Sequence, residues 1–417
     1  MSQPSLPAQV EANCERVVET TLDLLAFDTQ NPPGATTEVI EYIETVVTKA
    51  GLETERLSAA SADPGLVAWF PEQPAPELVF NGHIDTVPFD REAWTRDPLG
   101  ERDGSEIYGR GATDMKGAVA AMLAVVRAVA ETDATPAVPL GFVFSSDEET
   151  SGGETLRDGL DTFPSSPSAC LIGEMTGTSA RPSVAVADKG SIWLTLAATG
   201  EGAHGSRPTL GANAIDRLYD TVDSLRSELQ AVEFDLHPAV ERILTESVAY
   251  YAPTVGEDAA WTMFQHPTVN LGTMHGGEAV NSVPTAATAD IDIRLTASVP
   301  TASVLERIRA FVAERQGVEI QSTDWSEGTY EPLGRLLVEA VQTVSEAVTG
   351  ERTFARSATG GGDAKALRND GLSTVEFALG TETAHAVDER TTRQALCQTA
   401  QIYAHLPAAF DSSSTEA

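Results

Sequence analysis

The sequence predicts an α/β fold that is divided between two domains. Its 417 residues exceed what one compact core of ordinary size holds, and this length favours two domains. Short apolar runs of strand length alternate with segments of helical periodicity through most of the chain, which is the α/β pattern. The segment 190–323 instead follows a βαββαβ order, which indicates a separate small domain.

The elements of the larger domain follow from periodicity and from chain breakers. Helical spacing predicts a helix over 11–27 that Asn31-Pro32-Pro33-Gly34 ends, and a second helix over about 36–50 ends at Gly51. The segment 115–131 is apolar almost all round, so we expect a helix buried against a sheet. The predicted strands of this domain are 66–70, 78–82, 140–144, 169–173 and 374–379.

The smaller domain begins after Gly190. Its predicted elements, in order, are a strand over 191–198, a helix over about 211–230, strands over 268–274 and 286–295, a helix over about 302–316 and a strand over 318–323. Residues 233–265 show no clear periodicity and receive no assignment.

The composition is strongly acidic. Acidic residues number 62 against 27 basic ones, which gives a formal net charge of -35, and lysine occurs only as Lys49, Lys116, Lys189 and Lys365. Such self-repulsion is tolerable where salt screens it, so the composition resembles that of proteins from extreme halophiles. A surface of this sign also excludes nucleic acid and anionic membranes as partners.

The cysteines and the termini bear on the compartment. Cys14, Cys170 and Cys397 are an odd number at wide spacing, without the short spacings of a zinc finger or a disulfide framework, so we expect them to be reduced. The N-terminus lacks a basic-then-apolar signal, and no run reaches the roughly 18 apolar residues of a membrane-spanning helix. The sequence therefore predicts a soluble cytoplasmic protein.

Ligand-type side chains follow the ends of several predicted strands. Asp147, Glu148 and Glu149 come directly after the apolar run 140–144. Like charges held close together repel unless a cation or a proton intervenes, so this pattern favours a metal site, with a solvated acidic turn as the alternative. Similar residues follow other strands or precede the helix 115–131, namely His83, Asp85, Asp114, Glu174 and His385. Because sites in open α/β sheets gather at the carboxyl ends of strands, we expect these residues to converge.

The types of these side chains indicate which metal they bind. Imidazole nitrogen together with carboxylate oxygen suits zinc better than calcium, and cobalt or manganese would also fit. His83 and Asp85 lie two residues apart, so on an extended chain they face the same side. Asp85 is therefore expected to hold the second nitrogen of the His83 imidazole.

Several blocks occur in one order through nearly the whole chain: Gly82-His83-Ile84-Asp85-Thr86-Val87-Pro88, Gly109-Arg110-Gly111-Ala112-Thr113-Asp114-Met115-Lys116-Gly117, Asp147-Glu148-Glu149, Leu171-Ile172-Gly173-Glu174, Gly276-Gly277 with Asn281-Ser282-Val283-Pro284, and His385. These blocks resemble those of the di-zinc aminoacylase and carboxypeptidase family of metallopeptidase clan MH. That family includes succinyl-diaminopimelate desuccinylase, acetylornithine deacetylase and glutamate carboxypeptidase.

The resemblance implies roles for the converging residues. His83 and Glu174 would bind one zinc ion, Glu149 and His385 the other, and Asp114 would bridge the two. Glu148 would be the general base on a water held between the metals and would later pass the proton to the leaving amine. The resemblance also implies a cis peptide bond after Asp114, which is rare before a residue other than proline.

The resemblance further implies an architecture. A three-layer α/β/α catalytic domain of the zinc-peptidase type would comprise residues 1–187 and 329–417, and an inserted ferredoxin-like lid, 188–328, commonly forms a homodimer. His204 in the lid would then polarise the scissile carbonyl, often in the partner subunit's site, although the residues alone favour a surface histidine in a Gly-rich turn.

Four residues are candidates for binding substrate. Asn281 and Arg294 match lid positions that contact substrate, with a turn Asn and an ion pair to Asp290 or Asp292 as the alternatives. Gly361 and Asp363 match a further substrate block. In that block Gly362 and Lys365 stand where the family usually has a hydroxyl residue and an arginine.

The resulting functional prediction is a metal-dependent amidohydrolase of the desuccinylase or deacetylase type, acting on a small N-acyl amino acid. A dipeptidase or carboxypeptidase that takes short peptides is the first alternative. A metal-retaining scaffold without turnover is the second, and Glu148 discriminates against it, because only an enzyme needs a base beside the ligands.

Overall fold

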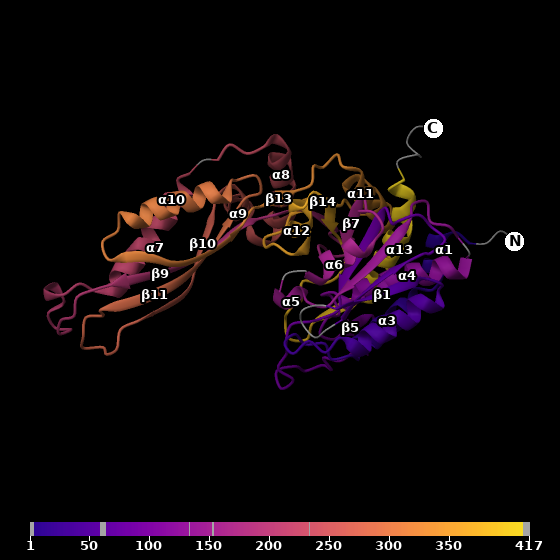
Figure 1. The fold of residues 1–417 in the computed structure, drawn as a ribbon, viewed down its shortest axis with the longest axis horizontal. Coiled ribbons are helices and arrows are strands. Elements are labelled where there is room, and N and C mark those ends of the chain that lie inside the picture. The colour runs from indigo at the N-terminus through magenta and orange to yellow at the C-terminus, as the bar shows by residue number, and fades with distance from the viewer. Residues whose placement is uncertain (1–3, 59–63, 133, 152–153, 233, 412–417) are drawn as a thin grey trace. The chain divides into compact units, whose positions relative to one another are not determined.

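The computed structural model describes residues 4–58, 64–132, 134–151, 154–232 and 234–411 (Figure 1). The chain divides into two compact units, the first comprising Met1–Val186, Glu331–Arg356 and Gly362–Ala417 and the second Ala187–Tyr330 and Ser357–Gly361. Sequence reasoning places the domain boundaries near 187 and 328, and the structure additionally groups 357–361 with the second unit. Among the helices of the described residues, none combines the length and the apolar character needed to cross a bilayer.

A mixed sheet forms the centre of the first unit, with the strand order β1-β2-β6-β3-β7-β15-β8. The central strands β6, β3, β7 and β15 are parallel to one another, and the outer pairings are antiparallel. The strands are β1 (Glu53–Ser58), β2 (Pro64–Trp69), β3 (Leu78–His83), β6 (Leu140–Ser145), β7 (Ala169–Ile172), β8 (Ser183–Asp188) and β15 (Ser373–Glu376), and short β13 (Thr329–Tyr330) and β14 (Phe354–Ser357) pair with β8. A small second sheet has the order β16-β5-β4, from β4 (Glu101–Asp103), β5 (Glu106–Tyr108) and β16 (Arg390–Thr392).

Helices cover both faces of the large sheet and make three layers. The helices of this unit are α1 (Leu6–Ala12), α2 (Cys14–Leu25), α3 (Thr37–Lys49), α4 (Lys116–Thr132), α5 (Glu148–Ser151), α6 (Glu154–Thr162), α11 (Leu336–Thr349), α12 (Asp363–Asn369) and α13 (Arg393–Ala409). On one face α6 and α12 pack against buried strand residues such as Val79 and Val143. On the opposite face α4 packs against β3, and α2 and α13 pack against α4. The α/β/α prediction is confirmed.

The close approach of α4 to β3 sets up the functional edge of the sheet. A Cβ atom on Gly82 would lie 2.7 Å from Val119 of α4, closer than real side chains pack, so glycine is needed there. Thirteen of the residues of α4 are buried, in agreement with its apolar sequence. The helix begins two residues after Asp114, and the peptide bond between Asp114 and Met115 is cis, as the resemblance implies.

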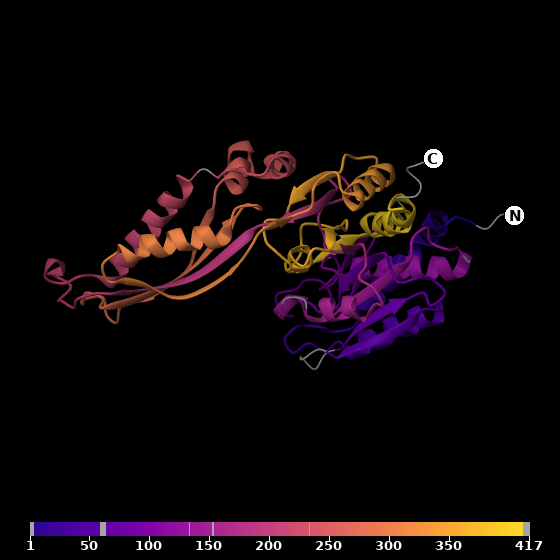
Figure 2. The same ribbon diagram turned by 45° about the horizontal axis from the view of Figure 1, so that its top comes forward.

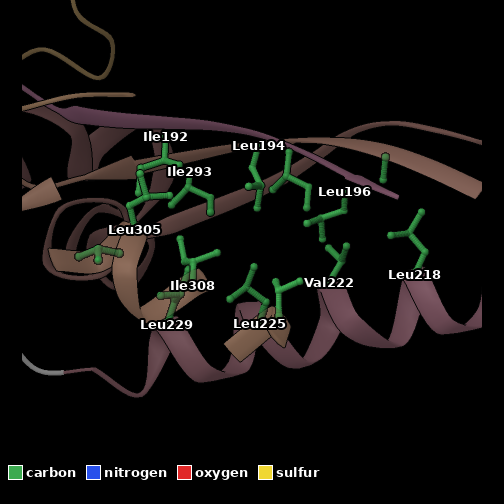
Figure 3. Close-up of a cluster of buried hydrophobic side chains, with 14 of the residues drawn as sticks. Ile192, Leu194, Leu196, Leu218, Val222, Leu225, Leu229, Ile293, Leu305 and Ile308 are labelled. Atoms are coloured by element: carbon green, nitrogen blue, oxygen red, sulfur yellow. The ribbon is translucent and has the colours of Figure 1, made fainter. Parts of the chain in front are cut away.

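The second unit is built on a four-stranded antiparallel sheet of order β10-β11-β9-β12. Its elements are β9 (Gly190–Thr199), η1 (Pro208–Leu210), α7 (Ala214–Gln230), α8 (Pro238–Val255), α9 (Glu257–Gln265), β10 (Thr268–Gly276), β11 (Ala286–Leu295), α10 (Thr301–Ala313) and β12 (Val318–Ser326). Figure 2 shows α7 and α10 on one side of the strands. Their apolar faces meet alternate strand residues in one core, where Leu225 and Ile308 lie opposite Leu194 (Figure 3).

Helices α8 and α9 fill most of the segment 233–265, for which sequence analysis predicts no element. Their caps explain their limits. His237 accepts a hydrogen bond from the backbone N–H of Ala239 at the start of α8, and Gly256, at φ 87°, separates the two helices. Pro253 inside α8 obscures the helical pattern in the sequence.

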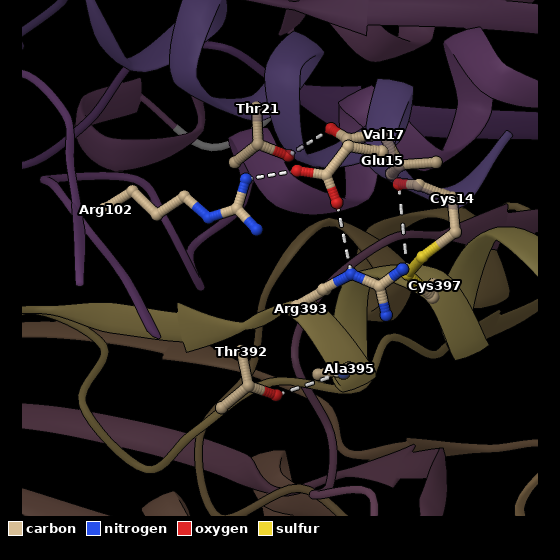
Figure 4. The surroundings of a disulfide bond; sticks show 9 residues. All are labelled: Cys14, Glu15, Val17, Thr21, Arg102, Thr392, Arg393, Ala395 and Cys397. Carbon is tan, nitrogen blue, oxygen red and sulfur yellow. Dashed lines mark hydrogen bonds and ion pairs between the residues drawn. A yellow bond between two sulfur atoms is a disulfide. The ribbon is translucent and has the colours of Figure 1, made fainter. Parts of the chain in front are cut away.

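A disulfide joins Cys14 at the start of α2 to Cys397 in α13, with the two Cα atoms 5.3 Å apart (Figure 4). The expectation of three reduced cysteines is therefore wrong for this pair, which lies 383 residues apart in sequence. Glu15 next to the bond forms ion pairs with Arg102 and Arg393. Cys170 is a buried free thiol.

Candidate metal centre

Neighbouring parallel strands bring the predicted ligands to one edge of the large sheet. β3 ends at His83, β6 leads directly into α5 with Glu148 and Glu149, and β7 ends two residues before Glu174. These strands are adjacent and parallel, so their carboxyl ends open at the same edge. The turn before α4 adds Asp114, and the segment that follows β15 adds His385. All these residues belong to the first unit.

The side chains form two groups that share Asp114. His83 Nε2 lies 3.1 Å from Asp114 Oδ1 and 3.1 Å from Glu174 Oε1. His385 Nε2 lies 3.1 Å from Asp114 Oδ2 and 3.4 Å from Glu149 Oε1. The ligand atoms of each group lie within 4.8 Å of one another, so each group fits around one ion. Asp114 therefore presents one oxygen atom to each histidine, as a bridging carboxylate does.

The chemistry of the groups fits a divalent cation. Glu149 Oε1 is buried and has no hydrogen-bond donor among the described residues, which is costly unless a cation meets it. Burial, followed by the charge of Asp114, raises the pKa of Glu174 to about 8. Burial also opposes the ionisation of Asp114, but hydrogen bonds from His385 and His83 outweigh it and lower the pKa of this carboxyl. Two imidazoles and three carboxylates form a ligand set that zinc, cobalt or manganese accepts.

The sequence matches the profile of the peptidase family M20/M25/M40 over residues 79–409. The chain belongs to this family. It is accordingly a metal-dependent hydrolase that acts on amide or peptide bonds.

Several relatives of this M20 member are desuccinylases by name. The chain is 31% identical over 381 residues to a succinyl-diaminopimelate desuccinylase from Cereibacter sphaeroides, an alignment that spans 88% of this chain and 92% of the relative. It is 30% identical over 284 residues to a probable succinyl-diaminopimelate desuccinylase from Staphylococcus epidermidis, spanning 65% of this chain and 66% of the relative.

Solved structures share the M20 fold at lower identity. An M20 metallo-carboxypeptidase from Sulfolobus solfataricus aligns with a TM-score of 0.75 at 18% identity, over 94% of this chain and 99% of that one. Human carnosine dipeptidase 1 aligns with a TM-score of 0.74 at 15% identity, over 98% of this chain and 99% of that one. A Bacillus subtilis protein described as a dinuclear metal-binding M20 peptidase aligns with a TM-score of 0.66 at 15% identity, over 95% of this chain and 98% of that one.

Asp85 contacts the ring of His83 through two oxygen atoms. Its backbone carbonyl lies 2.9 Å from His83 Nδ1, and its carboxylate Oδ1 lies 3.4 Å from the same nitrogen. The sequence led us to expect the carboxylate alone, whereas the backbone oxygen is the nearer partner. Asp85 Oδ2 accepts hydrogen bonds from the backbone N–H of Glu149 and from Asn31 Nδ2. Sequence reasoning missed Asn31, because Asn31-Pro32-Pro33-Gly34 signalled only the end of a helix.

The three acids after β6 have different surroundings. Asp147 Oδ2 accepts the backbone N–H of Thr155 in the first turn of α6, so it caps that helix. Glu149 faces His385. Glu148 belongs to neither group around Asp114, but its carboxylate lies with His83 and Glu149 in a third group of ligand-type atoms within 4.8 Å of one another. Burial, opposed by His83 and reinforced by Glu149, raises the pKa of Glu148. Asp363, which begins α12, is also buried, and burial followed by the charge of Glu148 raises its pKa to about 7.

The remaining predicted residues lie in the second unit. His204 is exposed and its Nδ1 lies 2.8 Å from Ser206 Oγ, while the backbone N–H of Gly205 donates to Asn281 O at 2.7 Å. The His204 turn and the Asn281 turn therefore lie side by side. Arg294 donates to Asp292 Oδ1 at 2.7 Å, which is one of the ion pairs considered as its alternative. Gly361 is exposed and also groups with this unit.

Proposed function

We propose that the protein is a two-metal amidohydrolase that cleaves the amide bond of an N-acyl amino acid, of the desuccinylase or deacetylase type. The observation that carries the proposal is Asp114, whose two oxygen atoms lie 3.1 Å from two different histidines, with Glu148 nearby and left outside both groups. The desuccinylase relatives support the acyl-amino-acid class.

Five residues would hold the two ions: His83, Asp114, Glu149, Glu174 and His385. Bound zinc, or cobalt or manganese in its place, would polarise the scissile carbonyl and make water more acidic. Glu148 would take a proton from the attacking water as its oxygen bonds to the carbonyl carbon. The same residue would deliver that proton to the nitrogen as the C–N bond breaks, which leaves a carboxylate and a free amine.

The raised pKa of Glu148 suits this role, because a carboxylate whose pKa lies nearer to neutrality accepts a proton from water more readily than an ordinary glutamate does and can still pass it on to the more basic leaving nitrogen. Asp85 would orient His83 and, through the backbone N–H of Glu149, would fix the start of α5. Asp363 and Gly361 are proposed to contact the substrate.

Hydrolysis of a panel of substrates tests this proposal. The metal-reconstituted protein is assayed with N-succinyl and N-acetyl amino acids and with dipeptides of matched side chains. The highest kcat/KM is expected for an N-acyl amino acid. A clear preference for dipeptides would favour the peptidase alternative, whose support is the naming of the solved neighbours. A protein that binds two ions and cleaves none of these compounds would be the silent scaffold.

We also propose a homodimer joined through the second unit, in which His204 completes the partner's site by polarising the scissile carbonyl. The support is that His204 belongs to a unit without any of the five metal ligands and is exposed in a turn beside Asn281. Asn281 would contact the substrate from the same pair of turns, and Arg294 would bind its carboxylate after leaving Asp292.

Complementation tests the shared site. Inactive Glu148→Gln protein is mixed with inactive His204→Ala protein under conditions that exchange subunits. A mixed dimer regains one intact site if His204 acts across subunits, so activity should return. Exchanged heterodimers without activity, or a fully active monomer in size measurements, would contradict the proposal.

A cytoplasmic location with high salt is a further proposal, and the net charge of -35 supports it. The Cys14–Cys397 disulfide is unusual for a reducing compartment. Its redox state in protein isolated under alkylating conditions from the native host therefore tests the location.

A further inference from the structure

We propose that Glu389, together with Arg110, is a positioning residue that holds the His385 ligand in register with the bridging Asp114. The inference rests on the proposed two-metal centre and names residues outside its ligand set. Glu389 lies four residues after His385, directly before β16, and Arg110 lies in the turn between β5 and α4.

One carboxylate oxygen organises the turn that carries Asp114. Glu389 Oε1 accepts hydrogen bonds from the backbone N–H groups of Gly111, Thr113 and Asp114, at 3.1, 3.0 and 3.1 Å. The side chain of Glu389 is fully buried, so these bonds do not compete with water. The backbone of the turn is thereby fixed up to the residue that bridges the two ligand groups.

The other oxygen connects this turn to the His385 segment. Glu389 Oε2 accepts a hydrogen bond from Arg110 Nη1 at 2.6 Å, and Arg110 Nη2 donates to the backbone carbonyl of His385 at 3.3 Å. The guanidinium lies over the ring of Trp94, 5.4 Å from its centroid, which limits its rotation. The buried pair of Glu389 and Arg110 therefore hydrogen-bonds the backbone of the turn that carries Asp114 and also the backbone carbonyl of His385.

The His385 segment needs such external support. The side chain of His385 is 54% exposed, so packing alone does not fix it. Its backbone has φ 61° and that of Asp388 has φ 55°, a left-handed conformation that is uncommon for residues other than glycine and that the surroundings help to hold. Asp388 is held by the backbone N–H groups of Thr95 and Arg96. The Arg110 bond to the His385 carbonyl acts directly at the ligand.

Stability alone gives a weak reason for this arrangement. Taking both charges of an ion pair out of water costs free energy that their attraction offsets only in good geometry, and apolar pairs often stabilise a core as well. A planar guanidinium and a carboxylate, by contrast, fix direction at both ends. Residues beyond the ligands that orient them typically change metal affinity about 10- to 100-fold when they are altered.

Two substitutions interrupt the connection at different points. Glu389→Gln keeps one oxygen for the three backbone donors but turns an amide NH₂ toward Arg110, which is itself only a donor. Arg110→Lys keeps the charge beside Glu389 but has no planar fork to reach the His385 carbonyl as well. Arg356→Lys is the matched control. Arg356 is a similarly buried arginine of the same unit, and it hydrogen-bonds Ser183 Oγ and Thr176 O, which belong to other segments than the one that carries His385, so the control reports the effect on folding of replacing a buried guanidinium.

Stepwise cobalt binding to the chelator-treated full-length protein is measured by calorimetry and by visible absorption, and thermal unfolding of the metal-free protein is measured in parallel. We expect one of the two affinities, that of the His385 group, to fall about 10- to 100-fold in both variants. The affinity of the His83 group should change much less. The melting temperatures should stay close to that of Arg356→Lys.

Three results would overturn the inference. They are unchanged affinities in both variants, a parallel loss at both sites, and a loss of folding that Arg356→Lys does not share, which would indicate a purely structural role. If the wild-type protein itself bound fewer than two ions, the two-metal proposal would fail and this inference with it. Two ions in the wild type with unaltered variants would refute the inference alone.

Discussion

Replacing Glu148 by Gln separates the proposed base from the metal ligands. The amide occupies nearly the same volume as the carboxylate but cannot accept a proton from water. Glu148 is the first residue of α5 and is outside the two ligand groups that share Asp114. We therefore expect the variant to keep both ions and to lose turnover.

The size of the loss follows from the role. A positioned general base contributes about 10²- to 10⁴-fold to a rate, which corresponds to about 3–5 kcal/mol of activation free energy. The loss should appear in kcat, with KM nearly unchanged, because the proton transfer belongs to the transition state and not to substrate binding.

The assay compares initial rates and metal content of the wild type, Glu148→Gln and Asp147→Asn. Asp147 is the matched control, since it is the neighbouring acid and its carboxylate caps α6 at Thr155. The control should retain kcat within a few-fold, with lower thermal stability. Turnover of Glu148→Gln close to that of the wild type would refute the base assignment, and loss of a metal ion from this variant would show that Glu148 is a ligand instead.

Three further predictions concern protons, salt and thiols. In the metal-free protein, the neighbouring carboxylates of Asp114 and Glu149 raise the pKa of His385 to about 10, so at neutral pH it carries a proton that a metal must displace. Metal binding should release protons, and the apparent metal affinity should fall about tenfold per pH unit of acidification for each proton displaced. A metal affinity that is independent of pH between 6 and 8 would contradict this prediction. Because 62 acids face 27 bases, the unfolding temperature should rise steeply with potassium chloride, and equal stability in dilute buffer and molar salt would refute the halophile interpretation. Thiol titration of the unfolded, unreduced protein should find Cys170 alone and reduction should add Cys14 and Cys397, whereas three thiols without reductant would exclude the disulfide.

The sequence predicted the features that depend on local pattern. Three apolar runs end just before ligand-type residues, namely His83, the pair Glu148 and Glu149, and Glu174. Because the carboxyl ends of neighbouring parallel strands lie at one edge of the sheet, the convergence of these side chains could be predicted from the sequence. Helix α4 was also predictable from local pattern, because a helix that is apolar all round is buried in a soluble protein.

The features that the sequence left out depend on contacts between distant segments. Glu389 accepts hydrogen bonds from backbone N–H groups about 275 residues earlier in the chain. Because almost every residue carries a backbone N–H, the residue types do not show which of these groups Glu389 contacts. The Cys14–Cys397 bond likewise closes a separation of 383 residues without any local spacing signal.

The most direct test of the two-metal centre is the metal content of chelator-treated protein after reconstitution with zinc, for the wild type, His83→Ala and His385→Ala. Two ions per chain are expected in the wild type and one in each variant, because each histidine belongs to one of the two groups that share Asp114. One ion in the wild type, or two ions still bound in His385→Ala, would contradict the centre described here.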